Sequence, residues 1–148
     1  MIAQPNKESS KKEITSNKID ISRHNDLRKL WFDTNNSSYK EKIAYNAFSP
    51  QKGIWNIKVE NGSLTEWEIR GRVNSITDKS TALMFTQENL YKMAEQTYNQ
   101  DAKAIYKSTV IYDQRGYIKE IIKKTNPDVP GYKPTDRGFS IKVLDITY

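Results

Sequence analysis

The 148-residue sequence contains no cysteine and a single histidine, His24. Without cysteine the chain can form no disulfide bond, no thiolate zinc site and no cysteine nucleophile. With one histidine it cannot build a site that needs two imidazole groups. It also lacks the GxGxxG and GKS/GKT motifs that bind phosphate groups through a glycine-rich loop. We therefore expect no cofactor.

Apolar residues are scarce as well, at 36% of the chain, with 6 glycines in addition. Counted together they make up about 40%, against ~45–50% in typical globular chains, so we expect a small core. No apolar run approaches the ~20 residues of a membrane-spanning helix. Residues 1–7 also lack the apolar segment of a secretory signal. The sequence is interpreted either as a cytoplasmic protein or as the mature part of an exported one, whose only membrane attachment would be a lipid anchor outside this sequence.

The net charge of +6 is dispersed along the chain. Residues 1–20 carry +1, residues 21–75 carry +3 and residues 76–148 carry +2. Proteins that bind nucleic acid usually concentrate their basic residues on one face or one helix. The pattern disfavours a nucleic-acid partner and favours, modestly, an acidic protein or an acidic envelope polymer.

Two helices are predicted within one domain that spans residues 20–148, after a polar and flexible tail at residues 1–19. The first helix lies at about residues 20–36, where Leu27, Leu30 and Trp31 form an apolar stripe. The second runs from about Thr86, a plausible N-cap, to Asn99. Its expected core face consists of Leu90, Met93, Ala94 and Tyr98.

Six strands are predicted from the alternation of apolar and polar residues, which is typical of a sheet with one solvated face. Residues 71–85 are interpreted as a connection without regular structure. The expected fold is an α+β two-layer sandwich of order α-βββ-α-βββ, in which two helices cover an antiparallel sheet of about six strands. The strands are expected at residues 39–48, 54–60, 64–70, 104–113, 117–124 and 138–148.

The turn at Asn61-Gly62 joins the second and third of these strands. A two-residue loop in a regular hairpin would place Glu66 and Glu68 among the buried side chains, at a cost of several kcal/mol each. We therefore predict a three-residue, bulged turn with Gly62 in the left-handed region. That turn places four apolar side chains on one face: Trp55, Ile57, Trp67 and Ile69.

Candidates for catalysis or metal binding are few. His24 is interpreted as a surface residue near a helix start, without a catalytic role. Glu66 and Glu68 fall on the solvated face of a strand, and Asp113 and Glu120 lie further apart. Paired carboxylates can support acid–base chemistry or cation binding, but a solvated face is the better interpretation of these pairs. We predict no catalytic residue and no metal site.

The segment between the last two strands is the most suggestive surface feature. Residues 125–136 form a long loop with three prolines, and basic and aromatic residues surround it. Long loops are often functional, although a rigid connector is the better interpretation of the three prolines. The predicted partner-binding residues are Lys123, Lys124, Tyr132, Lys133 and Arg137.

Residues 110–117 follow the pattern V-x-Y-D-x-x-G-Y, and weaker motifs occur at Trp31, 43–45, 59–62 and 84–90. Together, over about residues 27–147, they resemble a family of uncharacterised bacterial exported and lipoprotein-anchored domains. The family's cysteines after the first strand and its proline after G-Y are absent here. The resemblance implies an envelope location and a fold loosely similar to small secreted protease-inhibitory modules. It implies no catalytic residue.

The first functional hypothesis is a non-enzymatic cell-envelope domain, held by its tail, that binds a protein or an envelope polymer. The alternative is a cytoplasmic inhibitor or immunity-type protein that binds an acidic partner. A weaker alternative is a hydrolase or metal-binding enzyme that uses the carboxylates named above.

Overall fold

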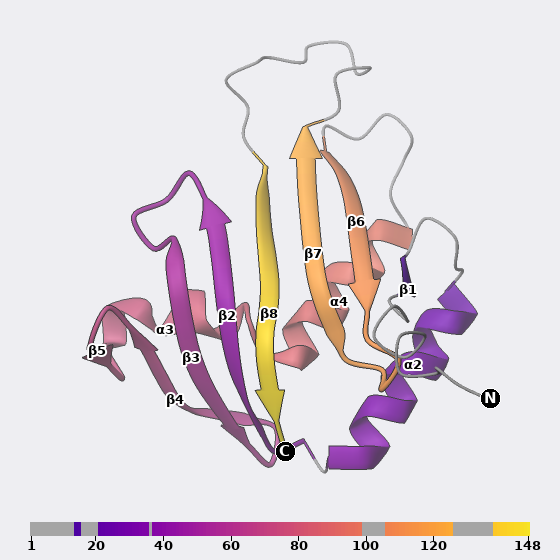
Figure 1. The fold of residues 1–148 in the computed structure, drawn as a ribbon, viewed down its shortest axis with the longest axis horizontal. Helices are drawn as coiled ribbons and strands as arrows, with labels where there is room; N and C mark the ends of the chain where they lie inside the picture. Colours follow the sequence, from indigo (N-terminus) through magenta and orange to yellow (C-terminus); the bar gives the residue numbers. More distant parts are fainter. Residues whose placement is uncertain (1–13, 16–20, 36, 99–105, 126–137) are drawn as a thin grey trace, which may run out of the picture.

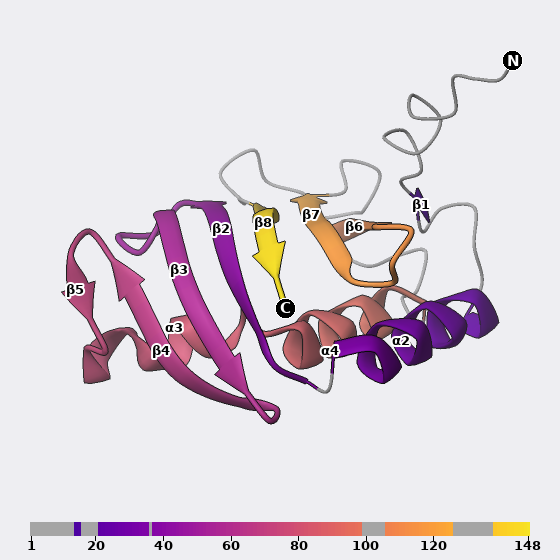
Figure 2. The ribbon, with the colours of Figure 1, turned by 60° about the horizontal axis from the view of Figure 1, so that its bottom comes forward.

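The computed structural model describes residues 14–15, 21–35, 37–98, 106–125 and 138–148. They form one antiparallel sheet with helices on one of its faces (Figures 1 and 2). The predicted α+β class and antiparallel sheet are confirmed. In sheet order the strands are β1 (Ile14–Thr15), β6 (Tyr106–Tyr112), β7 (Ile118–Thr125), β8 (Phe139–Thr147), β2 (Tyr39–Ala47), β3 (Gly53–Glu60), β4 (Ser63–Ile69) and β5 (Arg72–Val73).

The six predicted strands are all present, but the sheet is wider and the helical layer is richer than predicted. Two strands of two residues each, β1 and β5, extend its edges. Of the predicted tail, residues 1–19, the structure describes only β1, which pairs with β6. The helices are α2 (Ile21–Asn35), α3 (Lys79–Leu83) and α4 (Gln87–Tyr98), with a 3-10 turn, η2 (Ile76–Asp78), before α3.

The segment 71–85, predicted to be a connection without regular structure, contains β5, η2 and α3. These elements have two, three and five residues, too few to show a periodic pattern. The segment is held by side chains instead. The Arg72 guanidinium lies 3.0 Å from a carboxylate oxygen of the buried Asp78, and the Trp67 indole donates a hydrogen bond to the Ser75 carbonyl.

The hairpin between β3 and β4 corrects the predicted turn. Its loop has two residues, because Glu60 pairs with Ser63, and Asn61 and Gly62 both have positive φ. The expected bulge lies instead inside β4, where Thr65 is the extra residue. Because Thr65 is an extra residue, Trp67 and Ile69 point to the same face of the sheet as Trp55 and Ile57. All four side chains are buried, so the predicted common face is confirmed.

The two three-strand meanders meet at the β2–β8 pair in the middle of the sheet. This pairing brings the end of β2 next to the start of β8, with Ala47 opposite Phe139. The neighbouring strand β7 ends at the same end of the sheet, uppermost in Figure 1. Residues distant in sequence therefore converge at this end.

The helices pack beneath the sheet and enclose an aromatic core. On α2 the buried side consists of His24, Leu27 and Trp31, whereas Leu30 is 46% exposed, so the predicted stripe was wrong by one residue. The predicted N-cap of α4 is confirmed, because the Thr86 hydroxyl accepts a hydrogen bond from the Asn89 amide at 3.3 Å.

Candidate functional site

The structure describes two of the five predicted partner-binding residues. Lys123 and Lys124 lie near the end of β7. As neighbours in a strand their side chains point to opposite faces of the sheet. Lys123 approaches the ring of Phe139 at 5.7 Å, whereas Lys124 is exposed. Tyr132, Lys133 and Arg137 fall outside the described residues.

A hollow of about 640 Å³ opens at this end of the sheet. Three lysines line it, and none of the described residues that line it is acidic. We call it the basic hollow. Its lining residues are Asn46, Ala47, Phe48, Lys52, Ile122, Lys123, Lys124, Thr125, Gly138, Phe139 and Ser140.

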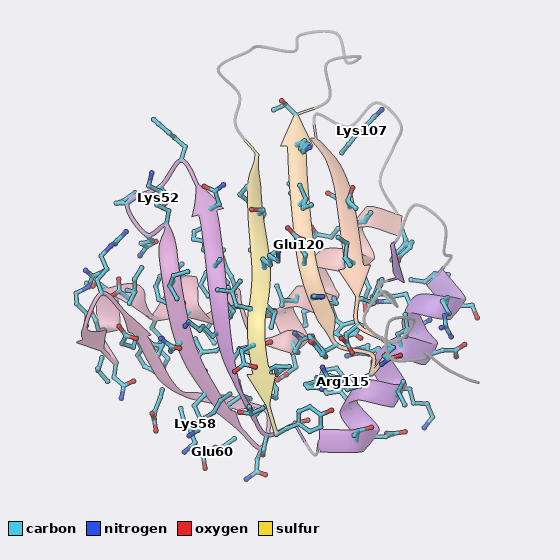
Figure 3. All side chains as sticks on the ribbon, in the orientation of Figure 1. Lys52, Lys58, Glu60, Lys107, Arg115 and Glu120 are labelled. Carbon is cyan, nitrogen blue, oxygen red and sulfur yellow. The ribbon has the colours of Figure 1, made fainter. Side chains whose placement is uncertain are left out.

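Lys52 is a member of this site that the sequence analysis missed. It lies in the turn between β2 and β3, about 70 positions from Lys124, and reaches the hollow through the β2–β8 pairing. Its only sequence signal is its place two residues after Pro50 in a turn. Figure 3 shows Lys52 at the end of the sheet where β7 ends, and Lys58, Glu60 and Arg115 at the opposite end.

The two ends of the sheet differ in how their charges are balanced. At the lower end in Figure 3, Lys58 lies 3.6 Å from Glu60, and Arg115 lies 3.0 Å from Asp113. Within the described residues, Lys52 forms no ion pair, nor does Lys124. Among the described residues, the positive charges of Lys52 and Lys124 at the basic hollow are therefore not neutralised by an ion pair.

Three of the four carboxylates in the two candidate acid pairs lie beside cations or hydrogen-bond donors. Glu66 lies 3.7 Å from Lys58, and Glu68 accepts hydrogen bonds from the Asn56 amide and the Gly71 backbone. These hydrogen bonds lower the pKa of Glu68. Both glutamates occupy the outer, solvated face of the sheet, as predicted. Asp113 binds Arg115 in the turn after β6, and Glu120 lies further along β7.

His24 is buried rather than exposed, which corrects the sequence-based prediction. Its Nδ1 lies 2.5 Å from the Tyr112 hydroxyl, and its Nε2 lies 3.2 Å from a carboxylate oxygen of Glu95. Burial lowers the pKa of His24, and the hydrogen bond and charge of Glu95 oppose that shift. Because His24 and Tyr112 are both fully buried, we interpret this network as a structural link between α2, α4 and β6.

Burial of neutral His24 should make stability depend on pH. With its folded-state pKa below the unfolded value of about 6.5, His24 makes the unfolded chain bind more protons in that range, so the His24 contribution to stability falls on acidification below pH 6.5. The stability of the wild type relative to His24→Gln, measured by urea unfolding, should therefore fall between pH 7.5 and 5. A difference between the two proteins that does not change with pH would contradict the assignment of the effect to His24.

Glu41 is a second buried polar residue that the sequence analysis missed. It is 2% exposed, between the outward-facing Lys40 and Lys42. Its Oε1 accepts a hydrogen bond from the Gln87 amide at 2.7 Å, and its Oε2 is buried without a partner. Burial raises the pKa of Glu41 to about 8. The sequence signal that could have predicted this burial is the alternation in β2, which places Glu41 on the same face as Tyr39 and Ile43.

Gln87 explains why this polar group is tolerated inside the core. Its side chain accepts a hydrogen bond from the Ile118 amide at 2.8 Å and donates one to the Ile118 carbonyl at 3.0 Å. β8 pairs with β7 only from Glu120 onward, so the Ile118 backbone has no partner in that strand. Gln87 replaces the missing strand partner, and Glu41 accepts the second hydrogen of its amide group.

Comparisons with known proteins give no match, whether with protein-family models, curated proteins or solved structures. Function is therefore inferred from geometry. In the part of the chain that the structure describes, no three potential metal ligands come together. No helix in that part is long and apolar enough to cross a bilayer.

Proposed function

We propose that this chain is a non-enzymatic binding domain whose basic hollow takes up an acidic segment of a partner protein. The observation that carries the proposal is the lining of the hollow, with Lys52, Lys123 and Lys124 around about 640 Å³ and no carboxylate among the described residues that line it. Complementary charge of this kind steers association and gives specificity.

A protein segment suits this site better than nucleic acid does. An interface for nucleic acid needs a basic stripe that follows the phosphate backbone. On the outer face of the sheet, a second hollow of about 370 Å³ mixes Lys40, Lys42 and Lys58 with acidic side chains. The basic surface is therefore interrupted beyond the hollow, which limits the length of anionic chain that it can accommodate.

For the cellular setting, we propose the cell envelope, supported by the resemblance to exported bacterial domains. A cytoplasmic inhibitor or immunity-type protein remains the alternative, and it would use the same hollow for an acidic partner. The sequence encoded upstream distinguishes the two settings. An export leader that ends in a lipobox cysteine supports the envelope, and its absence supports the cytoplasmic alternative.

Reversal of charge in the hollow should abolish most of the binding. The probe is a labelled 15-residue peptide of glutamate and serine, titrated by fluorescence anisotropy at 50 mM salt. We expect Lys52→Glu/Lys124→Glu to weaken binding by about 10-fold or more, because two attractive charges become repulsive. The matched control is Lys40→Glu/Lys42→Glu, which makes the same charge change on the outer face of β2. Equal weakening in both double variants would contradict the proposed site.

A further inference from the structure

A groove of about 360 Å³ lies on the helix side of the same end of the sheet. It is formed by α3, α4 and the adjoining ends of β7 and β8. Its described lining residues combine apolar side chains with lysines and include no carboxylate. The lining residues are Ser80, Leu83, Met84, Asn89, Lys92, Met93, Gln96, Lys123 and Phe139.

The floor of this groove is adaptable and apolar. Met84, Met93 and Phe139 are partly buried and pack against the core, and Leu83 is 38% exposed. Methionine side chains are flexible and polarizable, which suits surfaces that receive apolar groups of varied shape. Lys92 is an exposed residue of α4 at this groove. The groove thus offers an apolar floor beside positive charge.

The groove and the basic hollow adjoin at the end of the sheet, because Lys123 and Phe139 line both of them. The groove includes residues of the helices, whereas the hollow includes Asn46 and Lys124, which are exposed residues of the strands. A flexible chain can pass from one to the other, whereas a flat lipid surface cannot enter both.

We infer that the partner segment is amphipathic. Its carboxylates pair with Lys52 and Lys124 in the basic hollow, and its aliphatic or aromatic side chains enter the groove at Met84, Met93 and Phe139. The inference rests on the proposed function and specifies the chemistry of the partner, since acidic residues alone would leave the apolar floor exposed to water.

Two 15-residue peptides of equal charge test this inference on the full chain. One contains only glutamate and serine, and the other has leucine in place of four serines. We expect the leucine peptide to bind about tenfold more tightly, because its side chains remove apolar surface from water. Met93→Asp should erase this preference and leave the affinity for the glutamate–serine peptide within about twofold. Ile76→Asp, the same type of change at a residue that is 81% exposed on η2, should retain the preference.

The outcomes separate the inference from the proposed function. Equal binding of both peptides by the wild-type protein, or a preference that survives in Met93→Asp, overturns the inference while the basic hollow still stands. Tighter binding to vesicles of anionic lipid than to either peptide overturns it as well. Absence of binding to both peptides overturns the proposed function itself. If Met93→Asp fails to fold, Met93→Gln gives the same test without added charge.

Discussion

Replacing Gly116 with alanine is expected to destabilise the domain by about 3 kcal/mol or more. Gly116 closes the turn between β6 and β7 with φ +102°, a conformation that other residues rarely adopt. A Cβ at this position would overlap the Leu27 carbonyl and lie 2.9 Å from the Trp31 amide nitrogen. Both atoms belong to the backbone of α2, so the clash can be relieved only by moving the helix.

The matched control is Gly71→Ala. Gly71 also has a positive φ, of +79°, but a Cβ there would meet nothing within 4 Å. The Gly71→Ala variant should therefore lose only the free energy needed to hold alanine at a positive φ, about 1 kcal/mol. Urea unfolding followed by tryptophan fluorescence measures both variants. Similar losses in the two would show that α2 does not pack tightly on this turn.

Replacing Glu41 with glutamine is expected to stabilise the domain, increasingly so as the pH rises. Glutamine is shaped like the protonated carboxyl group and still accepts the hydrogen bond from Gln87. Because the pKa of Glu41 is raised to about 8 in the folded state, the native carboxyl binds a proton that the unfolded chain releases near pH 4.5. The Glu41 contribution to stability therefore falls between about pH 4.5 and pH 8, and the glutamine variant lacks this loss.

At pH 8 the variant should be more stable than the wild type by about 4 kcal/mol, and near pH 4.5 the two should be nearly equal. Thermal or urea unfolding across this pH range measures the difference. Glu66→Gln is the control, because the Glu66 side chain is 60% exposed beside Lys58. It should change stability by less than about 0.5 kcal/mol. A pH-independent effect of Glu41→Gln would contradict the buried, protonated carboxyl group.

Alternation of apolar and polar residues was sufficient to predict the six long strands and the buried face of β3 and β4. It could not locate the bulge at Thr65, because a bulge within a strand and a longer turn restore the same parity. It also could not identify β1 or β5, since two residues show no period and such strands form only by pairing with a neighbour. Local alternation thus predicts which face of a strand is buried, whereas the short strands at the edges of the sheet depend on tertiary contacts.

Buried polar residues were the main failure of sequence-based prediction. A histidine near a helix start is usually exposed. The hydrogen-bond partners of the buried His24 are Tyr112 and Glu95, and both are distant from it in sequence. For the same reason, only a part of the candidate site could be predicted. Lys123 and Lys124 are adjacent and visible as a basic pair, but Lys52 joins them only through the β2–β8 pairing. The groove at Met93 was missed because its helix face was assigned to the core.

The most direct test of the basic hollow is an NMR titration of the ¹⁵N-labelled full chain with the glutamate–serine peptide. We expect the largest amide shifts at Lys52, Lys124 and Ser140, which line the hollow, with little change at Lys40 or Lys58. Shifts should vanish at high salt, since screening removes attraction between exposed charges. Shifts that concentrate at Lys40 and Lys58, or that spread evenly over all exposed lysines, would contradict a binding site at this end of the sheet.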